Sequence, residues 1–133
     1  DGLREQADIL FILTTNRPED LEVALASRPG RIDQAIEFPL PDDDGRRKLI
    51  RLYAGTIAVS PTDVDEIARR TEKVSAAFIK ELMRRAVQFH VSRNGAGTLD
   101  LTDVEQALEE LLFSGGSLNL KLLGAEAVSR TSA

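Results

Sequence analysis

The chain has 133 residues, 42% hydrophobic and 29% charged, a balance typical of globular rather than disordered proteins. Its net charge of −5 and its lack of Trp argue against nucleic-acid binding, which favours basic surfaces and aromatic stacking platforms. Cysteine is absent, which excludes disulfides and thiolate chemistry and fits a cytoplasmic protein, and no apolar run is long enough to be a membrane segment.

The N-terminal part is expected to contain two strands and a short helix. Residues 9–13 are all apolar and lead into Thr14-Thr15-Asn16, a pattern typical of a buried strand in a parallel sheet. Ligands of open α/β sheets lie beyond the carboxyl ends of the strands, so Asn16 stands where a ligand-facing side chain belongs. A short helix is predicted for residues 18–27, and the alternation of residues 31–40 predicts a second strand.

A turn with two arginines follows the predicted short helix, in the order Arg28-Pro29-Gly30-Arg31. Guanidinium groups are well suited to hold phosphate oxygens in a bidentate way. The polar strand end and this turn together predict a phosphate-handling site.

Four helices are predicted beyond residue 41. The three carboxylates at residues 42–44 suit a helix N-cap and first turn better than a metal site. The helices are expected at residues 43–54, from the cap Ser60-Pro61, at residues 75–93, and from Thr102, whose spacing to Glu105 is that of a capping box. Their apolar residues recur every three or four positions, which predicts a bundle with a core of its own.

Four ordered sequence elements carry a family resemblance: Thr14-Thr15-Asn16-Arg17-Pro18, Ala24-Leu25, Arg28-Pro29-Gly30-Arg31-Ile32-Asp33 and Pro39-Leu40-Pro41-Asp42. With this spacing the chain resembles the AAA+ ATPases over roughly residues 1–113. It is most similar to the narrower AAA group of membrane-bound proteases, proteasomal ATPases and protein unfoldases.

The resemblance implies a mainly α fold with three parts. Residues 42–116 would form the four-helix lid subdomain, and residues 1–41 would be an incomplete α/β remnant of the P-loop NTPase large subdomain. The leucines of the tail, residues 117–133, suit a strand or a helix, and the tail stays unassigned.

Site residues follow from the same resemblance. It implies that Asn16 is the sensor-1 residue and that Arg28 and Arg31 are arginine fingers, which act on the nucleotide of a neighbouring subunit. Ser75-Ala76-Ala77 matches a Ser-Gly-Ala-type sequence that lets adenine or ribose approach, although the family usually has Gly at the position of Ala76. ATP and Mg²⁺ are the implied cofactors of the full-length protein. The implied partners are other copies of the chain in a ring, typically a hexamer, and a client protein.

Two parts of the nucleotide site are missing from the sequence. It contains no G-x-x-x-x-G-K-[ST] loop and no apolar strand ending in Asp-Glu, so the chain by itself should neither hydrolyse ATP nor bind it tightly. The strand that lies between the two predicted strands in the family is also missing, and the chain is expected to begin inside a larger domain. Residues 1–41 should therefore be partly disordered, rearranged or paired with another copy.

The expected function is that of the C-terminal part of an AAA-type ATPase that couples ATP binding and hydrolysis to remodelling or unfolding of client proteins. One alternative is a helical adaptor module without nucleotide chemistry, which leaves residues 14–31 unexplained. The other is a DNA-directed AAA+ loader, which the acidic charge disfavours. A sensor-2 arginine is also missing from the matching position, so Arg84 and Arg85 are interpreted as surface or intersubunit charges. The single histidine, His90, is expected to pack against the core, and no metal site is predicted.

Overall fold

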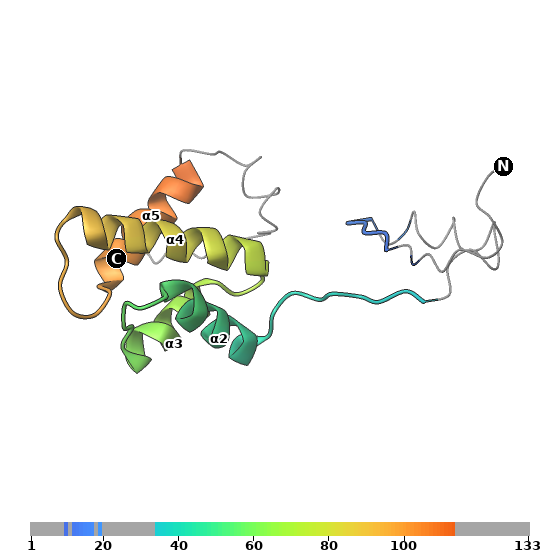
Figure 1. Ribbon diagram of the computed structural model, residues 1–133, viewed down its shortest axis with the longest axis horizontal. Coiled ribbons are helices and arrows are strands. Elements are labelled where there is room, and N and C mark those ends of the chain that lie inside the picture. Colours follow the sequence, from blue (N-terminus) through green and yellow to red (C-terminus); the bar gives the residue numbers. More distant parts are fainter. Residues whose placement is uncertain (1–9, 11, 18, 20–33, 114–133) are drawn as a thin grey trace. The chain divides into compact units, whose positions relative to one another are not determined.

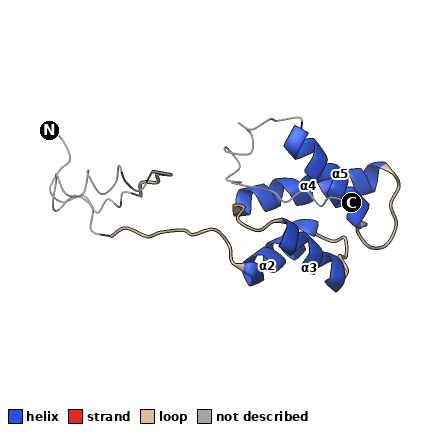
Figure 2. Ribbon diagram, turned by 180° about the vertical axis from the view of Figure 1, so that it is seen from behind, coloured by secondary structure: helices blue, strands red, loops and turns tan. Residues whose placement is uncertain are grey.

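The computed structural model describes residues 10, 12–17, 19 and 34–113. The chain divides into two compact units, Asp1–Phe38 and Pro39–Ala133. The described residues of the second unit form a helical bundle (Figures 1 and 2). No helix in the described ranges is long and apolar enough to cross a lipid bilayer.

The bundle contains the four helices that the sequence predicts. They are α2 (Asp43–Ala54), α3 (Pro61–Arg70), α4 (Ala76–Ser92) and α5 (Leu101–Phe113). The mainly helical fold of the lid is thereby confirmed, and α2 has the predicted bounds.

Caps at the helix ends explain most of these bounds. Asp42 accepts a hydrogen bond from the Gly45 amide at 2.7 Å and starts α2, and Gly55, at φ 66°, ends it in a conformation that favours glycine. The Ser60 hydroxyl accepts from the Asp63 amide at 3.1 Å, with Pro61 in the first turn of α3.

The start of α5 differs from the prediction, because Asp100 and not Thr102 is the cap. The Asp100 carboxylate accepts from the Thr102 amide at 3.1 Å, and the Asp103 carboxylate accepts from the Asp100 amide at 3.3 Å. This is a capping box formed by two aspartates. Glu105 instead forms an ion pair with Arg70 of α3 at 2.9 Å. The predicted box between Thr102 and Glu105 is therefore wrong.

Helix α4 is the centre of the bundle, since it packs against both α2 and α5, while α2 packs against α3 (Figure 1). Its side chains Phe78, Ile79, Leu82 and Met83 are fully buried. Burial of one side chain of this size contributes roughly 1.5–3 kcal/mol. The buried hydrophobic residues outside α4 come from the other three helices and two connections: Ile50, Ala54, Val64, Ile67, Ala68, Val74, Leu99, Val104, Ala107, Leu108 and Leu111.

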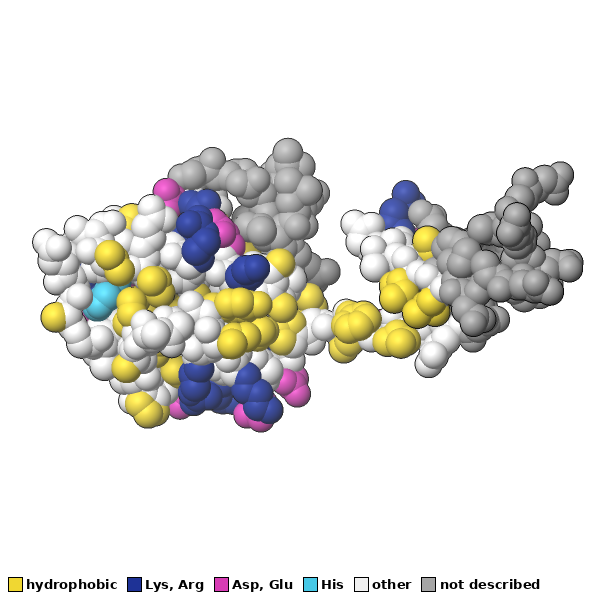
Figure 3. All heavy atoms as spheres, viewed as in Figure 1, with side chains coloured by type: hydrophobic (Ala, Val, Ile, Leu, Met, Phe, Trp, Pro, Cys, Tyr) yellow, Lys and Arg dark blue, Asp and Glu magenta, His cyan; other side chains and the backbone are white. Residues whose placement is uncertain are grey.

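The α/β remnant predicted for residues 1–41 is not confirmed, because no described residue lies in a strand. Residues 34–40 are all exposed, Ile36 by 68% and Phe38 by 89%, and apolar side chains line this segment (Figure 3). The physical reason is that a strand needs a neighbour for its backbone N–H and C=O groups. The described residues contain no strand that could serve as this neighbour.

Some predictions fall on residues that the structure leaves undescribed. The short helix predicted for residues 18–27 lies outside the described residues except for Glu19, which is helical. The tail, residues 117–133, also lies outside them.

Candidate functional site

The N-terminus of α4 is the part of the predicted nucleotide site that the structure describes in full. Ser75 is the N-cap, with an extended backbone at φ −74° and ψ 161°, and its hydroxyl accepts from the Phe78 amide at 3.1 Å. Ala76 and Ala77 form the first two positions of the helix and are exposed. Amides in the first turn of a helix have no acceptor within the helix, and the positive end of its dipole favours anions. This end of α4 therefore offers polar backbone groups without bulky side chains.

Asn16, the predicted sensor-1 residue, belongs to the other unit. It is exposed, at a bend, and the neighbouring Arg17 amide donates to the Thr15 hydroxyl at 3.0 Å. Arg28 and Arg31 lie outside the described residues. The structure thus places Ser75, Ala76 and Ala77 together, and their relation to the other three predicted residues stays a prediction.

A buried polar cluster joins α4 to α5, and the sequence did not point to it. The Asp103 carboxylate accepts from Arg93 Nε at 2.6 Å and Nη2 at 2.8 Å, and lies 3.1 Å from His90 Nδ1. Because an ionised carboxylate only accepts, His90 donates through Nδ1. The Arg93 guanidinium, followed by His90 and the Asp100 amide, lowers the pKa of Asp103 against the opposing effect of burial.

This cluster has a structural role. His90 is 3% exposed, which confirms its predicted packing role, and Asp103 is 2% exposed. The partner of His90 lies 13 residues further on, at the start of the next helix. Among the described residues, no three His, Cys, Asp or Glu side chains are grouped to hold a metal ion. The sequence signal that could have predicted this cluster is the spacing of Asp100 and Asp103, which is that of a capping box at the start of α5.

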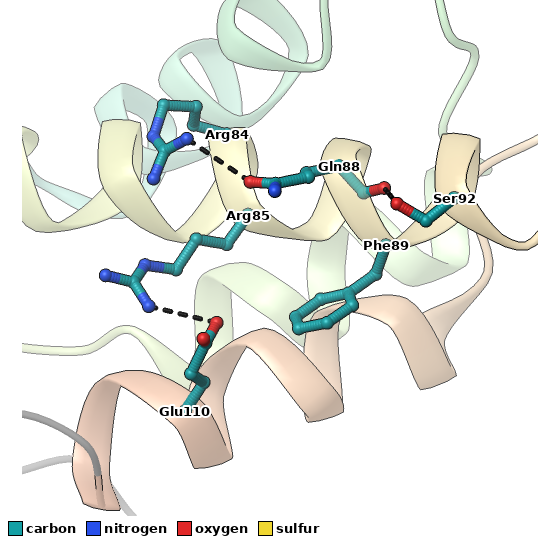
Figure 4. Close-up of a pocket in the computed structure, with 6 residues that line it drawn as sticks. All are labelled: Arg84, Arg85, Gln88, Phe89, Ser92 and Glu110. Carbon is teal, nitrogen blue, oxygen red and sulfur yellow. Dashed lines mark hydrogen bonds and ion pairs between the residues drawn. The ribbon is translucent and has the colours of Figure 1, made fainter.

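A shallow cavity of about 200 Å³ lies between α4 and α5 (Figure 4). Arg84 and Arg85 line it, and both bind the carboxylate of Glu81, at 2.8 Å in each case. Arg85 also binds Glu110 at 2.9 Å. These bonds, that of Arg84 first, lower the pKa of Glu81 to about 2. The cavity is therefore lined by neutralised ion pairs, which makes it a poor anion site.

Comparisons with known proteins give the family of the chain, although no protein-family model matches it. It is 32% identical over 113 residues to the proteasome-activating nucleotidase of Methanothermobacter thermautotrophicus, which covers 84% of this chain and 27% of the relative. It is 34% identical over 108 residues to the proteasome-activating nucleotidase of Methanococcus vannielii, covering 81% and 26%. It is 35% identical over 114 residues to the ATP-dependent zinc metalloprotease FtsH 3 of Sorangium cellulosum, covering 85% and 19%.

The chain belongs to the AAA+ ATPases. It matches the C-terminal part of the AAA+ ATPase module, as the sequence motifs predict. The chain spans about a quarter of the length of the nucleotidases and 19% of the metalloprotease. The names of these relatives describe a nucleotidase that activates proteasomes and an ATP-dependent zinc metalloprotease, and these activities are those of the relatives.

Proposed function

We propose that the chain is the lid-bearing C-terminal part of an AAA-type ATPase that couples ATP binding and hydrolysis to remodelling or unfolding of client proteins in the cytoplasm. The observation that carries this proposal is the N-terminus of α4, where Ser75 caps the helix and two exposed alanines follow within the AAA+ match. An adenosine group can approach the start of α4 because the exposed residues there are alanines, while Phe78 and Ile79 are buried.

The proposed roles of the chain's residues divide between its two parts. Asn16 orients the attacking water or the γ-phosphate, and Arg28 and Arg31 stabilise the charge that develops on the transferred phosphoryl group of a neighbouring subunit. The backbone at Ala76 and Ala77 lies beside the adenine or ribose. In the full-length protein, ATP and Mg²⁺ would be held mainly by a P-loop and an acidic strand that this sequence does not contain, and ATP would supply the phosphoryl group.

The proposal assigns three segments to the chain. Residues 1–41 belong to the large α/β subdomain and find their missing neighbour strand in the full-length protein, residues 42–116 are the lid, and residues 117–133 are an unassigned tail. The separation of the structural units at residues 38 and 39 fits a lid that rotates as one body. Because the fingers act across subunits, the working form is a ring of copies, proposed to be a hexamer.

The lid is built to move as a rigid body. Ion pairs connect its helices at three places: Arg47 with Asp65 at 2.7 Å, Arg70 with Glu105 at 2.9 Å, and Arg85 with Glu110 at 2.9 Å. Each surface pair contributes no more than about 1 kcal/mol. Together with the shared core they keep α2, α3, α4 and α5 in one arrangement.

The test uses the full-length protein with Arg28→Ala. We expect the ring to assemble and ATP turnover to fall by about 10³- to 10⁵-fold, the range known for arginine fingers in GTPases. Arg69→Ala is the control, because Arg69 is an exposed lid arginine paired with Glu66 at 2.7 Å. Normal turnover in an assembled Arg28→Ala ring would refute the finger assignment. Absence of ATP hydrolysis by the parent protein would refute the whole proposal and leave the helical adaptor module.

A further inference from the structure

Arg46, in the first turn of α2, is a buried arginine that joins three segments of the lid. Its side chain is 10% exposed, whereas the side chains of its neighbours Arg47 and Lys48 are 30% and 77% exposed. Its Nε donates to the Ala68 carbonyl near the end of α3 at 3.0 Å. Its Nη1 donates to the Pro41 carbonyl at 3.2 Å, and its Nη2 contacts the Asp43 carboxylate at 2.9 Å.

The contact with Pro41 matters because this residue ends the segment that leads into the lid. Residues 34–40 are all exposed, and Pro41 is half-buried. A Cβ on Gly45 would lie 3.3 Å from Pro41 Cβ and 2.9 Å from Asp42 Oδ1, so glycine at this position leaves room for Pro41 against the first turn of α2. Pro41 is thus held by a hydrogen bond from Arg46 and by close packing at Gly45.

We propose that Arg46 is a positioning residue that fixes the direction in which the chain enters the lid. The planar guanidinium binds the Pro41 carbonyl and the Ala68 carbonyl with different nitrogens, so it fixes residue 41 relative to α3 as well as to α2. In the proposed ATPase, and resting on that function, this connection transmits lid rotation to the linker instead of letting the linker bend at residue 41.

Lysine cannot replace this arginine. An ammonium group at the end of a flexible stem cannot reach two separate carbonyls and a carboxylate with a fixed fork. Hydrogen bonds made by a charged group contribute about 1.5–3 kcal/mol each, and 1.4 kcal/mol corresponds to tenfold in an equilibrium constant. Loss of the bond to Pro41 should therefore raise the population of molecules with a released linker by about tenfold or more.

The first experiment measures the linker directly in the 133-residue chain, which contains no cysteine. Spin labels are attached at Leu40→Cys and Glu72→Cys, both exposed positions. The distribution of distances between the two labels is recorded by pulsed dipolar electron paramagnetic resonance spectroscopy. We expect one narrow distribution in the labelled parent. In Arg46→Lys, a second and broader population should increase by about tenfold or more.

The matched control is Arg47→Lys, on the same helix turn. Arg47 also bridges α2 and α3, through Asp65 at 2.7 Å, and binds Asp43 of its own helix at 2.6 Å, and neither ion pair involves Pro41. This control should keep the narrow distribution. Arg46→Met, which retains the buried stem, is measured in parallel, and all variants are compared where circular dichroism shows native helix content. Unchanged distances in the folded Arg46 variants would overturn the proposal, because a merely stabilising role lowers the melting temperature without moving the linker.

The second experiment tests the coupling in the full-length ATPase. Arg46→Lys should lower kcat for ATP in proportion to the fraction of molecules with a released linker and leave KM within about twofold of the parent, because Arg46 holds the linker and does not touch the nucleotide. Normal kcat with a released linker would overturn the coupling role. Absence of ATP hydrolysis by the parent protein would instead refute the proposed function, and the distance measurement in the 133-residue chain would still decide the position of the linker.

Discussion

Replacing Asp103 with alanine should destabilise the junction between α4 and α5 strongly, because this buried carboxylate accepts several hydrogen bonds at once. The Arg93 side chain is 47% exposed and can bind water when Asp103 is removed, so the loss of the ion pair between Arg93 and Asp103 costs little. His90 Nδ1 and the Asp100 amide lose their acceptor at 3.1 and 3.3 Å. His90 is buried, and a buried donor without a partner costs about 1–3 kcal/mol, whereas the Asp100 amide belongs to an exposed residue and can bind water, so the substitution should cost about 1–3 kcal/mol.

The assay is thermal unfolding of the chain followed by far-ultraviolet circular dichroism. In a domain of this size 1 kcal/mol corresponds to about 4–8 °C, so Asp103→Ala should lower the Tm by about 4 °C or more. Asp103→Asn keeps the shape and one acceptor and should fall in between. Glu109→Ala, at an exposed position of the same helix, is the control. A Tm for Asp103→Ala within about 2 °C of the parent would refute the reasoning.

Two further predictions concern the same bundle. The pKa of Glu81 is about 2, chiefly because of its hydrogen bond from Arg84, and is 4.5 without such partners, so the stabilisation is complete above pH 4.5 and is lost as the pH falls through 2. The Tm should therefore decrease less on acidification in Glu81→Gln than in the parent, and equal decreases would contradict this assignment. In Gly95→Ala, the added Cβ would lie 2.5 Å from ring atoms of His90, which should cost about 1–3 kcal/mol in urea unfolding. The exposed neighbour Ala96→Ser should unfold at the parent's urea concentration, and a parental midpoint for Gly95→Ala would show that the loop relaxes.

The hydrogen bonds of Arg46 and those of the polar cluster around Asp103 share no residue. Arg46 acts where the chain enters α2, and Asp103 acts where α4 gives way to α5. Variants at the two sites should therefore have separate effects, one on the linker and the other on the stability of the bundle. Sites that share no partners are expected to give additive changes in the free energy of unfolding.

Family and helix positions could be read from the sequence because both depend on residues close together in the chain. The cap of α2 at Asp42, the Ser60-Pro61 start of α3 and the cap at Ser75 all act over three residues. Apolar residues at helical spacing then select the buried face of each helix, and the ordered AAA+ motifs identify the family without knowledge of the fold.

Tertiary structure alone decided which polar side chains meet. Arg46 reaches the Ala68 carbonyl 22 residues away, and His90 reaches Asp103 across a loop, pairings that depend on how helices pack and leave no periodic signal. The N-cap of α5 is Asp100 and not the predicted Thr102, and the Asp103 carboxylate that binds Arg93 and His90 also accepts from the Asp100 amide. The two predicted strands were not confirmed, and the complementary reason applies: a helix satisfies its own backbone hydrogen bonds, whereas a strand depends on a neighbouring strand, and the described residues contain none.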